Sequence, residues 1–109
     1  MTEDNRVHVG SGNVFADLGL SNPEERLIKA DLARKISETI NSRKLTQTEA
    51  AEILGIDQPK ISALSRGRLA GFSTERLIYF LNALGNDVEI VVKPKPESRN
   101  YAKTSVICY

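Results

Sequence analysis

A short basic stretch near the middle of the chain carries the side chains best suited to binding a charged partner. Between residues 58 and 68 the sequence holds three bases, Lys60, Arg66 and Arg68, and no acid. Gln58 begins this stretch, and a glutamine amide can both donate and accept hydrogen bonds. The bases would neutralise a polyanion while the amide selects among its hydrogen-bonding groups. The combination therefore favours recognition of a polyanion over catalysis.

Two short helices separated by a glycine are predicted to position this stretch. Thr46 and Glu49, three residues apart, form the signature of a capping box, which marks the start of the first helix. Gly55 ends that helix, since glycine adopts the left-handed cap conformation without steric cost. Asp57 is a good N-cap for the second helix. Pro59 then falls in the first turn of that helix, where its missing N–H does little harm.

The turn between these helices is so short that they must cross steeply and meet through small residues. Ala51 supplies the small contact, Gly55 the turn, and Ile61 an apolar side chain from the second helix. Together with Gln47, this spacing is that of a helix-turn-helix, whose second helix enters the DNA major groove. The sequence therefore predicts a DNA-binding protein.

The stretch from Thr46 to Arg66 resembles the Cro/repressor-type, or XRE-family, helix-turn-helix proteins. The flanking pieces GNVFADLGLSNPEE and GFSTERLIYFLNALGNDVEI are similar to HigA-like antitoxins of type II toxin–antitoxin systems. This resemblance implies a repressor that binds a palindromic operator and regulates its own operon. It also implies a toxin partner, a RelE-like, ribosome-dependent ribonuclease that this protein would neutralise.

Base contacts are expected from the outward side chains of the second helix, because Ile61 and Leu64 are predicted to point into the core. Gln58 is the best candidate, since a glutamine that binds adenine through two hydrogen bonds gives about 1–3 kcal/mol of discrimination. Arg43 is a weaker candidate for a phosphate contact, because an isolated base is usually a solvated charge. Gln47 and its neighbouring N–H groups are placed to bind a phosphate. The predicted DNA-binding residues are Gln47, Gln58, Pro59, Lys60, Ser62, Ala63, Arg66 and Arg68.

Length and composition limit the size of the fold and the classes of protein that fit the sequence. A chain of 109 residues is enough for one small domain, and its net charge of +1 says nothing about nucleic acid. Cys108 is the one cysteine, so an intrachain disulfide is impossible, which fits a reducing cytosol. The sequence shows neither a signal peptide nor an apolar run long enough to span a membrane. We therefore expect a cytoplasmic protein.

The expected fold is mostly α, a repressor-like helix-turn-helix domain of four to five helices with a short C-terminal β-strand. A long helix is predicted after Pro23, and Ser73 is the expected N-cap of a last helix ended by Gly85. The alternating residues 87–92 predict the strand. Residues 23–92 would form the DNA-binding and dimerisation domain, between a flexible N-terminal arm, 1–22, and a flexible tail, 93–109. A strand needs a partner, so Val88, Ile90 and Val92 are expected to form the interface of a homodimer.

The N-terminal arm carries apolar residues that lie outside the predicted core. They are Val7, Val9, Val14, Phe15, Leu18 and Leu20. These residues either cover the helical domain or bind a partner, and the resemblance to antitoxins favours a toxin as that partner. His8 is the lone histidine and has no second ligand at metal-binding spacing. We therefore expect neither a metal nor another cofactor.

Two alternatives to the antitoxin remain open. A stand-alone XRE-family regulator would bind DNA without a toxin, and a protein-interaction adaptor would have lost DNA binding. The bases at Lys60, Arg66 and Arg68 argue against the adaptor. An enzyme is the least favoured, because the sequence offers no nucleophile–base pair, metal cluster or glycine loop that could hold a phosphate.

Overall fold

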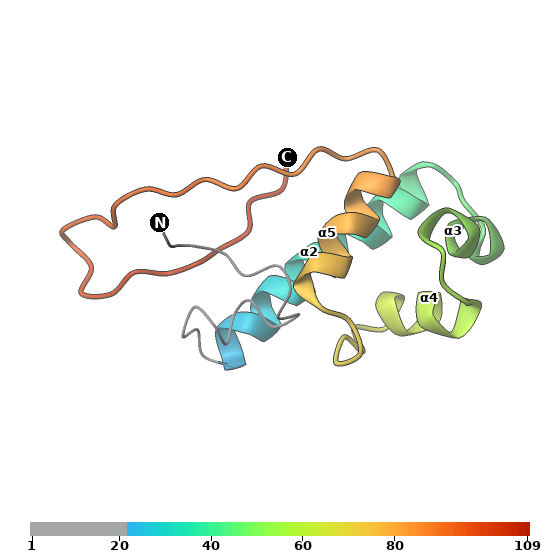
Figure 1. The fold of residues 1–109 in the computed structure, drawn as a ribbon, viewed down its shortest axis with the longest axis horizontal. Coiled ribbons are helices and arrows are strands. Elements are labelled where there is room, and N and C mark those ends of the chain that lie inside the picture. The colour runs from blue at the N-terminus through green and yellow to red at the C-terminus, as the bar shows by residue number, and fades with distance from the viewer. Residues whose placement is uncertain (1–21) are drawn as a thin grey trace, which may run out of the picture.

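The computed structural model describes residues 22–109, which form four helices followed by an extended tail (Figure 1). α2 spans Asn22–Ser42, α3 spans Gln47–Leu54, α4 spans Gln58–Ser65 and α5 spans Thr74–Ala83. All four helices were expected from the sequence. α2 extends to Ser42, so only a short link of residues 43–46 separates it from α3.

Local side-chain caps explain where the short helices begin and end. At the start of α3, Thr46 Oγ1 accepts from the Glu49 backbone N–H at 3.1 Å, and Glu49 Oε1 accepts from the Thr46 N–H at 2.8 Å. Gly55 ends α3 in the left-handed region with φ 70°. At the start of α4, Asp57 Oδ1 accepts from the Lys60 N–H at 3.0 Å. These contacts confirm the predicted capping box, glycine cap and N-cap.

A single hydrophobic core lies between the four helices. α2 packs mainly against α5 and α3 packs mainly against α4, so the first and last helices form the support for the helix-turn-helix. Phe72, just before α5, is buried and its ring meets that of Phe80 edge to face, with centroids 6.0 Å apart. The buried core residues are Ile28, Leu32, Ile36, Ala50, Ala51, Leu54, Ile61, Leu64, Phe72, Leu77, Phe80, Leu81 and Leu84. No helix within residues 22–109 is both long enough and apolar enough to cross a membrane.

The turn that follows α2 contains a strained residue. Lys44 has φ 57°, the left-handed region that side-chain-bearing residues rarely adopt. The Lys44 N–H donates to the Asn41 carbonyl at 3.0 Å, and the Leu45 N–H donates to the Ile40 carbonyl at 3.1 Å. These bonds satisfy carbonyls that the helix end would otherwise leave without a donor. The strain at Lys44 therefore accompanies a tight turn from α2 into α3.

The predicted C-terminal strand is not found in the described part of the chain. Residues 86–96 follow α5 as an extended segment, but they form no strand and no backbone ladder with any other described residue. Val88 packs against the core, whereas Ile90 and Val92 are 77% and 90% exposed. A strand is defined by pairing, and this chain offers none in its described part. Val7 and Val9, whose alternation with polar residues could also form a strand, lie outside the described residues.

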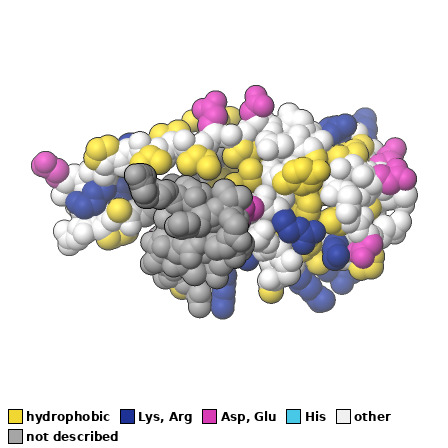
Figure 2. Space-filling model, viewed as in Figure 1, with side chains coloured by type: hydrophobic (Ala, Val, Ile, Leu, Met, Phe, Trp, Pro, Cys, Tyr) yellow, Lys and Arg dark blue, Asp and Glu magenta, His cyan; other side chains and the backbone are white. Residues whose placement is uncertain are grey.

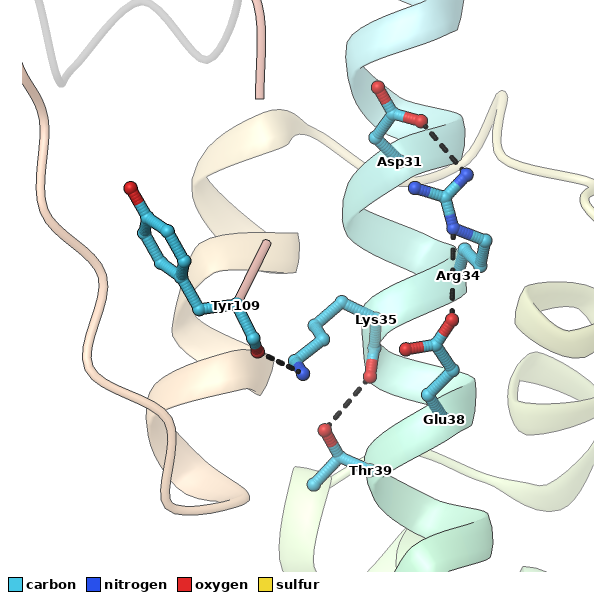
Figure 3. A network of polar contacts seen from close by, with 6 residues as sticks. All are labelled: Asp31, Arg34, Lys35, Glu38, Thr39 and Tyr109. Atoms are coloured by element: carbon cyan, nitrogen blue, oxygen red, sulfur yellow. Dashed lines mark hydrogen bonds and ion pairs between the residues drawn. The ribbon is translucent and has the colours of Figure 1, made fainter. Parts of the chain in front are cut away.

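The tail turns back toward the helices. After residue 96 the chain reverses, and Figure 1 shows its last residues returning alongside the preceding extended segment. The Arg99 N–H donates to the Pro96 carbonyl at 3.2 Å within this reversal. Val106 packs against the core, and the Tyr109 carbonyl accepts from Lys35 Nζ at 3.0 Å (Figure 3). The end of the tail thus contacts α2.

Charged residues on the outer face of α2 pair with one another. Arg34 lies between Asp31, at 3.2 Å, and Glu38, at 3.8 Å (Figure 3). Thr39 Oγ1 donates to the Lys35 carbonyl one turn earlier at 2.8 Å. Ion pairs one turn apart on an exposed helix contribute only a few tenths of a kcal/mol. This charged surface of α2 therefore adds little to the stability of the fold.

Candidate nucleic-acid interface

The burial of α4 decides which of its side chains could reach a partner. Ile61 and Leu64 are 4% and 3% exposed, so one face of the helix is fixed in the core. Gln58, Pro59 and Lys60 are exposed, and they begin the helix together. The N-terminal part of α4 is therefore the part that projects from the domain, as the helix-turn-helix geometry requires.

The next turn of α4 is less accessible than its start. Ser62 is half-buried, and Ala63 is half-buried with its side chain packed against the core. The sequence assigned both to the outward face. A helix of eight residues packed on two sides leaves only a narrow outward strip, so Ala63 has less surface for DNA than its spacing indicates.

Gln58 is held in place by a residue of the preceding helix. Its amide Nε2 donates to Thr48 Oγ1 at 2.7 Å, and both side chains are exposed. Thr48 is the second residue of α3 and Gln58 is the first residue of α4. The bond therefore connects the starts of the two helices across the outside of the turn.

Three bases lie on the same part of the molecule without acidic partners. Lys60, Arg66 and Arg68 are exposed, and none forms an ion pair with any residue in the described part of the chain. Figure 2 shows several Lys and Arg side chains at the α4 end of the molecule, with an acidic side chain beside them and further Asp and Glu side chains toward α3. Unpaired bases on one surface produce the local positive potential that phosphates require.

Backbone hydrogen bonds after α4 fix the positions of Arg66 and Arg68. The Arg66 N–H donates to the Ser62 carbonyl at 3.0 Å, and the Arg68 N–H donates to the Ala63 carbonyl at 2.9 Å. Gly67 between them has φ 77°, which a glycine adopts without strain. The backbone of both arginines is thus bonded to the last turn of α4.

The start of α3 offers backbone donors beside Gln58. Gln47 and Thr48 are the first two residues of α3, and both are exposed. Their N–H groups precede the first intrahelical bond, while the capping box already uses the N–H of Glu49. The positive end of the helix and these two donors point to an anion contact. Gln47 therefore lies where the sequence predicted a phosphate-binding residue.

Arg43, the weakest of the candidate bases, forms a hydrogen bond within the protein. Its Nη1 donates to the Leu84 carbonyl at 3.1 Å, at the end of α5. That carbonyl belongs to the last turn of the helix, where acceptors lack intrahelical donors. Arg43 thus has a structural partner, whereas the side chains of Lys60, Arg66 and Arg68 have none among residues 22–109.

Thr48 is the residue that sequence analysis missed. It is a short hydroxyl side chain ten positions before Gln58, and nothing in its type or spacing alone indicates a contact. The signal becomes visible only after the turn places the first residues of both helices side by side. The predicted partner-binding residues Val7, Val9, Val14, Phe15, Leu18 and Leu20, together with His8, lie outside the described residues.

Comparison with known proteins agrees with this geometry. Residues 14–93 match the helix-turn-helix domain family HTH_37. A solved structure named as an XRE-family transcriptional regulator superimposes with a TM-score of 0.78 at 48% sequence identity, covering 82% of this chain and 100% of that one. The chain belongs to the XRE family of helix-turn-helix regulators. No curated protein matches the sequence.

Family membership assigns roles to the elements already described. α3 and α4 lie within the matched helix-turn-helix domain of this XRE-family protein, and α4 occupies the second-helix position of that motif. Membership in a family of transcription regulators favours a non-enzymatic role. The matched stretch begins at residue 14, so it includes part of the predicted N-terminal arm.

Proposed function

We propose that this XRE-family protein is a sequence-specific transcriptional repressor that binds a palindromic DNA operator as a homodimer. One observation supports this most strongly: the exposed start of α4 presents Gln58 among bases that have no acidic partner in residues 22–109. Repression then follows from occupancy, because a protein seated on a promoter excludes polymerase.

Each group on this surface has a separate role in the proposed complex. Gln58 donates to adenine N7 and accepts from adenine N6 in the major groove. Lys60, Arg66 and Arg68 contact phosphates, which position the protein without selecting sequence. Gln47 and the backbone donors at the start of α3 hold one further phosphate. Specificity therefore depends on Gln58, whereas affinity and salt dependence depend on the bases.

The homodimer supplies a second recognition helix. One helix-turn-helix contacts only a few base pairs, and a two-fold dimer places two such helices about 34–36 Å apart on successive turns of the duplex. The extended segment after α5 offers the interface, because Ile90 and Val92 are exposed and the backbone there lacks a ladder within the described chain. When the segments of two chains pair, each gains the backbone hydrogen-bonding partner that it does not have among the described residues. Val88 lies at the start of each paired segment.

The experiment that tests DNA recognition uses duplexes selected by the protein from a randomised pool. The unaltered protein should enrich a palindromic sequence, and Gln58→Ala should lower the preference for that sequence over scrambled DNA by about tenfold, as expected for one lost bidentate contact. Thr104→Val, at an exposed site in the tail, provides a control that should retain the preference. If no sequence is enriched, the repressor is wrong and the protein-interaction adaptor takes its place.

We further propose that this repressor is an antitoxin that neutralises a RelE-like ribonuclease toxin. The support is the resemblance of the flanking sequences to HigA-like antitoxins, together with the character of residues 1–22. That segment is acidic overall and carries the predicted partner-binding valines, leucines and phenylalanine, a composition suited to covering a basic ribonuclease. The family match begins at residue 14, which favours a different role for the apolar residues of this segment. On that alternative, Val14, Phe15, Leu18 and Leu20 cover the helical domain and bind no toxin.

Truncation separates the antitoxin from a stand-alone regulator. Removing residues 1–20 should leave operator binding intact while abolishing neutralisation of a ribonuclease co-expressed from the neighbouring reading frame. Normal neutralisation by the truncated chain would move the toxin-binding element to the helical domain or the tail. If the neighbouring frames encode no ribonuclease, the stand-alone regulator is correct.

A further inference from the structure

We propose that Thr48 is a positioning residue that makes Gln58 select adenine over guanine. This inference rests on the proposed reading of DNA by Gln58 and assigns the specificity of that contact to a second residue. The observation behind it is the bond from Gln58 Nε2 to Thr48 Oγ1 at 2.7 Å, which joins α3 to α4.

The orientation of the Gln58 amide decides which base it can bind. A free glutamine amide has two N–H donors and one carbonyl acceptor. Guanine shows two acceptors in the major groove, N7 and O6, whereas adenine shows the N7 acceptor and the N6 donor. A free amide can therefore turn its donors toward guanine or present one donor and one acceptor to adenine. Its selectivity depends on which orientation the protein holds.

The hydrogen bond to Thr48 holds the Gln58 amide in one orientation. When Nε2 donates one hydrogen to Thr48 Oγ1, the amide retains one donor and its carbonyl acceptor for the base. One donor beside one acceptor complements adenine and mismatches the two acceptors of guanine. The bond also restrains the side-chain rotamers of Gln58 before DNA arrives, which lowers the entropy lost on binding.

Neighbouring contacts keep both partners where the bond needs them. The capping box between Thr46 and Glu49 fixes the first turn of α3, which carries Thr48. The Asp57 cap fixes the first turn of α4, which carries Gln58. Ala51 and Ile61 are both buried where the helices meet, so the two starts cannot move apart without opening the core. Thr48 itself is exposed and fills no cavity, so its loss should affect orientation more than stability.

Matched variants at position 48 test the idea. Thr48→Val keeps the shape and removes the hydroxyl, Thr48→Ser keeps the hydroxyl, and Thr104→Val repeats the same chemical change at an exposed site in the tail. The measurement is the ratio of dissociation constants for two duplexes, the selected operator and the same operator with guanine replacing the adenine that Gln58 contacts. The unaltered protein, Thr48→Ser and Thr104→Val should all favour adenine by about tenfold or more.

Thr48→Val should lower this adenine-to-guanine ratio to near one while thermal unfolding stays unchanged. In a Gln58→Ala background, Thr48→Val should have no further effect on the ratio, because the two residues act through one contact. If Gln58→Ala loses the ratio but Thr48→Val retains it, the positioning role is wrong and the proposed repressor stands. If Gln58→Ala itself retains the ratio, the proposed readout by Gln58 is what fails, and the inference fails with it.

Discussion

Arg43 and Leu84 join the end of the first described helix to the end of the last. Arg43 Nη1 donates to the Leu84 carbonyl at 3.1 Å, and nearby the Asn86 side chain donates to Thr39 Oγ1 at 3.1 Å. The two contacts hold the chain leaving α5 against α2. The extended segment that follows, which carries the proposed dimer interface, therefore starts from a fixed point.

Arg43→Ala should lower the free energy of unfolding by about 1 kcal/mol. A charged donor at a helix C-terminus satisfies an otherwise orphan carbonyl and interacts favourably with the helix dipole. Arg34→Ala provides the control, because Arg34 is 61% exposed and forms only surface ion pairs, so its loss should cost under about 0.5 kcal/mol. Urea unfolding of both variants measures the difference. Equal losses would show that the Leu84 contact adds nothing to stability.

Substitutions at Lys44 should rank in stability by how easily each residue adopts a left-handed backbone. Lys44 has φ 57°, so Lys44→Gly should relieve strain and raise the unfolding free energy by up to about 1 kcal/mol. Lys44→Val should lower it by about 1 kcal/mol, since a β-branched residue disfavours this region most. Thermal unfolding gives the order Gly above Lys above Val. A valine variant as stable as the unaltered protein would contradict the strained turn.

Arg66→Ala should weaken DNA binding without changing sequence preference. Each phosphate contact releases counterions, so losing one should reduce the slope of log K against log salt concentration by about 1. Lys103→Ala, an exposed base in the tail, should leave the slope unaltered. Titrations at several salt concentrations measure both variants. An unchanged slope for Arg66→Ala would mean that the DNA contacts a different face of the domain.

Ile90→Lys should shift the proposed homodimer toward monomer. Ile90 is 77% exposed in the single chain, and a buried charge would oppose pairing of two apolar segments. Leu27→Lys is the matched control, because Leu27 is an apolar residue of α2 with 63% exposure and lies outside the proposed interface. Sedimentation equilibrium at micromolar concentration measures both. A monomeric unaltered protein, with or without operator DNA, would refute this assembly.

The start of α3, the start of α4 and the glycine between them were predictable from the sequence because their causes are local. Thr46 and Glu49 are three residues apart, and Asp57 caps the third residue after it, so spacing alone indicates the hydrogen bonds. Burial of Ile61 and Leu64 followed from helical periodicity for the same reason. The exposed start of α4 could therefore be predicted before the tertiary structure was considered.

Contacts between residues that are far apart in the sequence were decided only by the tertiary structure. Whether Arg43 meets a phosphate or Leu84 depends on how α2 packs against α5, and the partial burial of Ala63 depends on what covers α4. The expected strand at residues 87–92 did not form because pairing depends on a second segment, which local β propensity does not supply. The bond between Thr48 and Gln58 arises in the same way, since it exists only once the turn has brought two helix ends within 2.7 Å.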